Sequence, residues 1–242
     1  MIFRRRNPIA QLTGWTGVAL EFLLVLFGVL IALQVNNWNT GRVDKDRAGK
    51  TLSLLRSEVE ANIAAIDDRL ALIEGTREVR QSGLTALSAC DPSPAGRKAV
   101  GDAIGQMTGV LIPYLVDISL LELARQGRFL DLLSNDFRAA LNVYSGRLSG
   151  EREQLAINYN LMWAQHIVNH STVGIEMAEA DIRSGVFVVG ESVEVLCQDG
   201  EFKRQFSMTE GWHQSAKLRM QRFRGWSEDF LAVIDKELAS FE

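Results

Sequence analysis

Hydrophobic residues form one long run near the start of the chain. Residues 18–35 read VALEFLLVLFGVLIALQV, in which Glu21 is the only charged side chain. A membrane-spanning helix needs about 20 mostly apolar residues, because the hydrocarbon core is about 30 Å thick. Trp15 and Trp38 flank the run, and indole rings favour the two membrane interfaces. The pattern predicts a transmembrane helix over residues 15–38, with Trp15 and Trp38 as interface anchors and residues 1–14 as a preceding tail.

One face of this helix combines small residues with the carboxyl group. At 100° per residue, a single stripe holds Gly14, Gly17, Glu21, Gly28 and Ala32. Small residues let membrane helices approach closely, and a polar side chain in lipid seeks a partner. These five residues are therefore predicted to form a helix–helix contact. Two alternatives for Glu21 stay open: the side chain reaches the headgroups or is protonated there, or it belongs to a proton relay.

The remaining chain has mainly a helical period. From residue 42 to about 89, apolar positions recur every three or four residues, which predicts one long helix: Leu52, Leu55, Val59, Ile63, Ile66, Leu70 and Ile73. Pro92 and Pro94 end it. Shorter helices are predicted over 97–108, over Leu120–Leu123 to about 127, from Ser134 onward, over 151–169 and over the last forty residues, with an apolar connector at 109–116.

Two β-prone runs interrupt the helical pattern near the C-terminal third. Residues 186–189 and 193–196 flank Gly190-Glu191, a pair compatible with a tight two-residue turn. We therefore expect a small β-hairpin near residues 186–196. The expected fold class is mainly all-α: an N-terminal transmembrane helix followed by a helical-bundle domain over residues 39–242.

Charge helps to exclude one class of partner and to orient the chain. The net charge is −4, and of 26 basic and 30 acidic residues only Arg4, Arg5, Arg6 and Glu21 precede Trp38. The acidic remainder disfavours nucleic-acid binding. Basic residues lie on both sides of the apolar run, so the positive-inside count is nearly balanced. The absence of a small-x-small cleavage site favours an uncleaved anchor with a cytoplasmic N-terminus and a periplasmic or otherwise extracytoplasmic domain.

Cys90 and Cys197 are the only cysteines. In an oxidising compartment they would be free to form a disulfide. Two lone cysteines are, however, more often buried thiols, so both interpretations stay open.

The block EFLLVLFGVLIALQVNNWN at residues 21–39 resembles a motif of a family of uncharacterised bacterial single-pass membrane-anchored proteins. A second, looser block is similar to that family at LELARQG (residues 121–127), LLSND (132–136) and Tyr144. Leu20 stands where the family has Gly, and Thr40 where it usually has an acid. The resemblance implies a bacterial inner-membrane anchor with a basic cytoplasmic tail, and it implies no activity.

Candidate chemistry is sparse. His166 and His170 would be one turn apart on a predicted helix, a spacing that suits two metal ligands, with Glu176 as a third. The surrounding residues match no metalloprotease motif, and no nucleophile motif occurs. An ordinary histidine pair is therefore the competing interpretation. A basic cluster at Lys217, Arg219, Arg222 and Arg224 is interpreted as a solvated helix face, or as a contact with anionic headgroups.

The sequence thus predicts a membrane-anchored scaffold or accessory subunit of a membrane protein assembly, with no cofactor. Its partners would be the lipid bilayer and either another membrane protein or further copies of this chain. An extracytoplasmic ligand-sensing domain that relays through a partner is the alternative. A metal-dependent enzyme built on His166 and His170 is the third hypothesis.

Overall fold

The computed structural model describes residues 15–108, 112–125, 127–178 and 181–241, and within these ranges all side chains except those of 15–16, 127–128, 177–178 and 181–186. Most of this chain is helical, and two strands form one antiparallel sheet. The elements in chain order are α1 (Trp15–Gly75), α2 (Arg77–Ser88), α3 (Pro94–Met107), α4 (Ile118–Arg125), α5 (Gly127–Leu130), α6 (Asn135–Ala164), η2 (Ile167–Asn169), β1 (Val173–Ala178), β2 (Asp181–Val189), α7 (Val193–Leu196) and α8 (Gly200–Leu238).

The chain divides into two compact units, Met1–Lys50 with Phe241, and Thr51–Ser240. The first unit holds the apolar part of α1. Within the described residues, one helix is long and apolar enough to cross a membrane; an 18-residue window in it has a mean hydropathy of 2.5, and none of that window is buried. The second unit is the predicted helical bundle.

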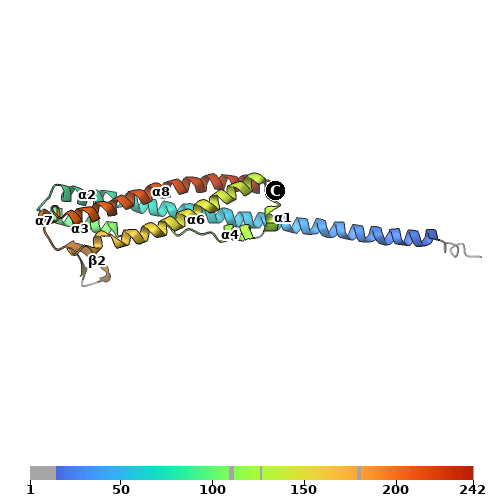
Figure 1. Cartoon of the computed structure of the whole chain (residues 1–242), viewed down its shortest axis with the longest axis horizontal. Coiled ribbons are helices and arrows are strands. Elements are labelled where there is room, and N and C mark those ends of the chain that lie inside the picture. The colour runs from blue at the N-terminus through green and yellow to red at the C-terminus, as the bar shows by residue number, and fades with distance from the viewer. Residues whose placement is uncertain (1–14, 109–111, 126, 179–180, 242) are drawn as a thin grey trace, which may run out of the picture. The chain divides into compact units, whose positions relative to one another are not determined.

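Three long helices build the bundle. The last part of α1, together with α6 and α8, runs along its length, while α2, α3, α7 and β2 gather at one end and α4 lies at the other (Figure 1). An aromatic stack lies between α6 and α8, where the rings of Tyr144 and Phe230 are 4.4 Å apart between centroids and nearly parallel. Phe137 and Phe223 extend this stack on either side. Burial of these rings supplies much of the apolar area that holds α6 to α8.

A second apolar core fills the end of the bundle that contains α2 and α3, which we call the tip. Its residues come from α2, α3, η2, β2, α7 and the first turns of α8: Ala86, Leu87, Val100, Ala103, Ile104, Met107, Ile167, Val189, Val193, Leu196, Cys197, Phe202 and Phe206. Six short segments thus share one core, so each depends on its neighbours for burial.

The predicted helix over residues 42–89 is wrong in one respect, because it breaks at Thr76. Gly75 has a poor helix propensity, and Thr76 Oγ1 donates to the carbonyl of Leu72 at 2.9 Å, a back-bond that bends helices. Helix α2 then ends before Pro92, as predicted. Ser93 caps α3 by accepting from the Gly96 amide at 3.1 Å.

The predicted helices that begin at Ser134 and at residue 151 are one helix, α6. Ser134 is its N-cap, as the sequence indicates, and accepts from the Phe137 amide. Gly146 and Gly150 do not end it, because they lie on its exposed face while buried residues continue on the other: Phe137, Leu141, Tyr144, Leu148, Leu155 and Met162. The helix stops at Ala164, short of the predicted residue 169.

The predicted hairpin over residues 186–196 is correct only for its first run. Strand β2 pairs with β1, with Val173 opposite Val189 and Ile175 opposite Phe187. Residues 193–196 form helix α7 instead of a strand. Val193 and Leu196 are both buried one turn apart, which suits a helix packed on the tip core and overrides the β propensity of valine.

Candidate functional site

The predicted helix-contact stripe lies on the exposed part of α1. Gly17, Glu21, Gly28 and Ala32 all fall in this helix, and Gly14 lies outside the described residues. Large apolar neighbours are exposed as well; Phe22 and Leu24, for example, are 67% and 66% exposed. A Cβ atom added at Gly28 would meet nothing within 4 Å. This face is therefore available to lipid or to another helix.

One of the two predicted interface anchors can be placed. The Trp38 ring is 68% exposed, and the Arg42 guanidinium lies 5.5 Å from its centroid. An exposed indole beside a cation one turn away suits the boundary between lipid and headgroups. Trp15 begins α1, but its side chain is not among those that the structure describes.

The interpretation of His166 and His170 as a pair on one helix face is wrong. Both residues lie beyond α6 in extended backbone, on either side of η2. His166 Nε2 donates to the Met107 carbonyl at 3.1 Å, and its Nδ1 accepts from the Val168 amide at 3.2 Å. His170 Nδ1 contacts Thr172 Oγ1 at 2.8 Å, and its Nε2 lies 3.4 Å from an Asp199 oxygen. All four ring nitrogens therefore face protein partners.

The third proposed metal ligand does not join them. Glu176 is exposed on β1. Among the described residues, no group of three or more His, Cys, Asp or Glu side chains could hold a metal ion. The metal-dependent enzyme hypothesis thus loses the geometry on which it rested.

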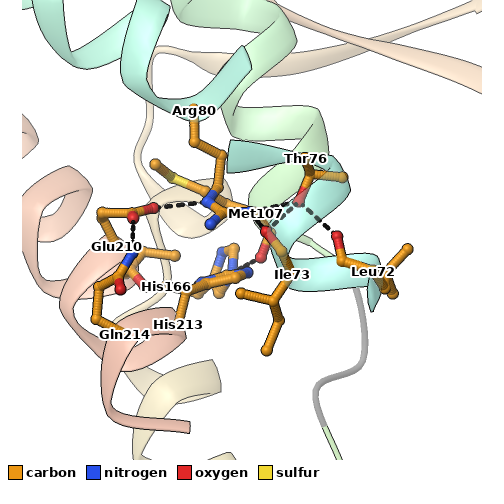
Figure 2. Close-up of polar contacts among 10 residues, drawn as sticks. Leu72, Ile73, Thr76, Arg80, Met107, His166, Glu210, His213 and Gln214 are labelled. Carbon is orange, nitrogen blue, oxygen red and sulfur yellow. Dashed lines mark hydrogen bonds and ion pairs between the residues drawn. The ribbon is translucent and has the colours of Figure 1, made fainter. Parts of the chain in front are cut away.

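A buried polar cluster that the sequence analysis missed occupies the tip. Arg80 of α2 is 0% exposed, and its Nε donates to Glu210 of α8 at 2.7 Å. Its Nη1 donates to the Ile73 carbonyl at 3.1 Å and to Thr76 Oγ1. Figure 2 shows these groups converging from three helices, with His166 and His213 beside them. The ion pair therefore ties the end of α1 and the start of α2 to α8.

His213 belongs to the same cluster. Its Nδ1 donates to the Thr209 carbonyl at 3.0 Å, and the residue is 1% exposed. Burial lowers the pKa of His213, and the positive charge of Arg80 lowers it further. Burial also lowers the pKa of His166. Burial thus favours the neutral form of both imidazoles, and at His213 the guanidinium of Arg80 favours it further.

Cys90 and Cys197 form a disulfide, with their Cα atoms 5.4 Å apart. Cys90 follows α2 and Cys197 follows α7, so the bond joins segments that are 107 residues apart in sequence. Of the two open interpretations of these cysteines, the structure contains the bridge.

Three of the four members of the basic cluster are half-exposed on α8 and pair with carboxylates. Lys217 lies 2.6 Å from Glu74, Arg219 lies 3.1 Å from Glu151 and Arg224 lies 2.6 Å from Asp67. These carboxylates come from α1 and α6. These cations of α8 therefore pair with neighbouring helices at a partly solvated surface, and Arg222 lies on an exposed position.

The described part of the bundle holds two small pockets and an open surface groove. A pocket of about 40 Å³ lies between α6 and α8 near Met162 and Trp212, and one of about 10 Å³ lies beside Pro113. The groove of about 1010 Å³ runs along α2 and the start of α3 and is lined mainly by exposed short or charged side chains. Small-molecule sites are usually concave pockets of at least about 300 Å³. The two pockets between the helices are smaller than this, and the groove, although larger, is open to solvent.

Comparison of the chain with family models, with curated proteins and with solved structures gives no match. The resemblance of the block at residues 21–39 therefore stays a prediction.

Proposed function

We propose that this protein is a single-pass scaffold or accessory subunit of a bacterial inner-membrane assembly. It binds its partner, either another membrane protein or a second copy of the chain, through the stripe of α1 and through the bundle. The observation that carries the proposal is the exposed apolar part of α1. No residue of its 18-residue segment of high mean hydropathy is buried. Because this helix carries a carboxyl group on a small-residue face, it can be more than a tether.

The proposed topology has the N-terminus in the cytoplasm and the bundle in the periplasm. Arg4, Arg5 and Arg6 precede the helix and favour retention of the tail inside. The Cys90–Cys197 disulfide supports an oxidising compartment for the bundle, because cytosolic thiols are kept reduced.

A contact function suits the bundle better than the two alternatives. A ligand sensor would need an enclosed pocket, and the pockets between the helices hold only about 40 and 10 Å³. An enzyme would need a catalytic group, whereas Arg80 of the tip pairs with Glu210, and His166 and His213 hydrogen-bond to backbone carbonyls.

The proposal is tested by chemical crosslinking of the full-length protein in native membranes, with a reagent that does not react with cysteine. The crosslinked partner is then identified. Glu21→Leu and Gly28→Leu should each reduce the crosslinked species several-fold, because one removes the polar contact and the other blocks close approach. Leu30→Phe enlarges a side chain on the opposite face of the helix and serves as the matched control.

The expected result is a loss for the two stripe variants and no change for Leu30→Phe. Equal yields for Glu21→Leu, Gly28→Leu and the unmodified chain would remove the helix-contact proposal. A loss of the same size for Leu30→Phe would instead mean that any change in this helix disturbs insertion.

A further inference from the structure

The polar cluster of the tip joins five elements at one point. Arg80 in α2 reaches the last turn of α1 through the Ile73 carbonyl and reaches α8 through Glu210. His166, before η2, reaches the last residue of α3 through the Met107 carbonyl. The charged and titratable groups around this point are, element by element, Glu74 in α1, Arg80 in α2, His166 before η2, and Glu210, His213 and Lys217 in α8.

The hydrogen bonds of His166 require a neutral ring. Its Nε2 faces a carbonyl oxygen and so carries the proton, while its Nδ1 accepts from the Val168 amide. Protonation of Nδ1 would turn that acceptor into a donor facing another donor. It would also remove the cap of η2, because His166 is the N-cap residue and this is the capping bond.

The cluster contains one carboxylate for its one buried guanidinium, so a second positive charge would lack a counter-charge. Arg80 and His213 are 0% and 1% exposed, and Glu210 is the carboxylate that faces Arg80, with Gln214 donating to its second oxygen at 2.8 Å. Glu74 pairs with Lys217 at the surface, at 2.6 Å. An imidazolium at position 213 would therefore share one carboxylate with a buried guanidinium, and an imidazolium at position 166 would interact unfavourably with a protonated His213.

Helix α2 is fastened to α8 at both of its ends, by bonds of different kinds. The Cys90–Cys197 disulfide lies just after α2 and just before α8. The Arg80–Glu210 pair lies near the start of α2, further along α8. Between them Gly83 lets α2 approach α3 and α8 closely, since a Cβ there would meet Ala103 Cβ at 2.3 Å.

We propose that the cluster is an acid-sensitive latch: protonation of His213 beside Arg80, or of His166 beside His213, releases α2 from α8 at the Arg80 end, while the disulfide holds the other end. The start of α2 therefore moves away from α8, while the Cys90–Cys197 disulfide keeps the end of α2 in place. The long helices of the bundle do not need to separate. This inference is independent of the proposed membrane function.

The direction of the pH effect follows from proton binding. Histidine in the open, hydrated form titrates near pH 6.5, and the pKa values of His166 and His213 are lower in the closed form because of burial. The open form thus binds protons at pH values at which the closed form does not. The closed tip is fully stable above pH 6.5 and loses stability as the pH falls from 6.5 toward the lowered values. The population of the open form rises up to about tenfold per pH unit for each histidine.

Hydrogen exchange of the full-length, disulfide-bonded protein in detergent micelles tests the latch. Amide protection factors of α2, which already correct for intrinsic exchange, are measured at pH 7.5, 6.0 and 5.0. They should fall several-fold between pH 7.5 and 5.0, while those of α6 change little. Constant protection of α2 from pH 7.5 to 5.0 would overturn the proposal.

Asparagine variants assign the effect to the two histidines. Asparagine is a good N-cap acceptor at position 166 and can donate to the Thr209 carbonyl at position 213, and it does not titrate in this range. The double variant His166→Asn/His213→Asn should keep α2 protected at pH 5.0, and each single variant should reduce the pH response. His170→Asn, whose ring lies against Phe202 outside the cluster, should respond as the unmodified protein does. An undiminished response in a folded double variant, or in both single variants, would also overturn the latch.

Discussion

Asp67 of α1 and Arg224 of α8 are 157 positions apart in the sequence, yet Arg224 Nε lies 2.6 Å from Asp67 Oδ1. The same pairing recurs on both sides, with Arg56 opposite Asp235 and Glu74 opposite Lys217. Each step forward along α1 is matched by an equal step backward along α8. The pair of Arg80 and Glu210 continues the series beyond Thr76, in α2. Charge pairs thus mark one antiparallel register from the middle of α1 into α2.

Reversal of one charge in this series should weaken the bundle more than its removal. Arg224→Ala should lower the thermal midpoint only slightly, because exposed ion pairs contribute little. Arg224→Glu should lower it further, since it faces Asp67 and Glu228 with a like charge. Adding Asp67→Arg to Arg224→Glu should restore most of the loss. The measurement is circular dichroism during heating, and a double variant no better than Arg224→Glu would contradict the pairing.

Breaking the buried pair should be far more costly. Glu210→Gln leaves the buried Arg80 charge without its carboxylate, which should reduce the free energy of unfolding by up to about 3–5 kcal/mol. Arg80→Met together with Glu210→Met should recover much of this loss, because no charge is then left unpaired. Urea titration of the three forms checks the order, with Asp229→Asn, an exposed carboxylate of the same helix, as the control.

Serine at both cysteine positions removes the disulfide and leaves the other side chains of the tip core in place. Cys90→Ser with Cys197→Ser should lower the free energy of unfolding by about 2–4 kcal/mol, because the unfolded chain regains the freedom of a long loop. In the unmodified protein purified without reductant, alkylation should add mass only after reduction. Alkylation of the unreduced native protein would show that the thiols are free.

Two glycines should respond to alanine in opposite directions. At Gly83 the new Cβ would lie 2.3 Å from Ala103 Cβ and 2.9 Å from the Ala99 carbonyl, so α2 and α3 must separate, at a cost of about 1–3 kcal/mol. At Gly150 nothing lies within 4 Å, and alanine should stabilise α6 by about 0.5–1 kcal/mol. Denaturant titration of both variants provides the test; destabilisation by Gly150→Ala would mean that this face of α6 is covered in solution.

Apolar periodicity predicts the buried faces of the long helices well, because a helix fixes which side chains share a face. Leu52, Leu55, Val59, Ile66 and Ile73 are buried, as their spacing indicates, whereas Ile63 and Leu70 of the same predicted stripe are half-buried. The ends and joints are predicted less well, since they depend on contacts between distant segments. The bend at Thr76 leaves the apolar pattern intact, and the short helix at Val193–Leu196 depends on the core of the tip rather than on its own valines.

The polar cluster could have been suspected from one sequence position. Arg80 lies one heptad after Ile73 and one before Leu87, in line with the apolar stripe of α1. A charged residue on a buried stripe requires a partner. The identity of that partner, Glu210, lies 130 positions away and follows only from the antiparallel return of α8. His166 is similarly hidden, because the helical pattern of α6 runs on past the residue at which the chain turns.

The return of α8 also sets where the chain leaves the bundle. Asp235 pairs with Arg56 near the beginning of the bundle, and Glu237 accepts from the Ser134 amide at 2.7 Å at the start of α6. The bundle therefore begins and ends at the same place, opposite the tip. A fluorescent protein or photoreactive label fused after residue 241 would sample the neighbours of that shared end. A label in β2 would sample a different neighbourhood, so the two positions together would triangulate a bound partner.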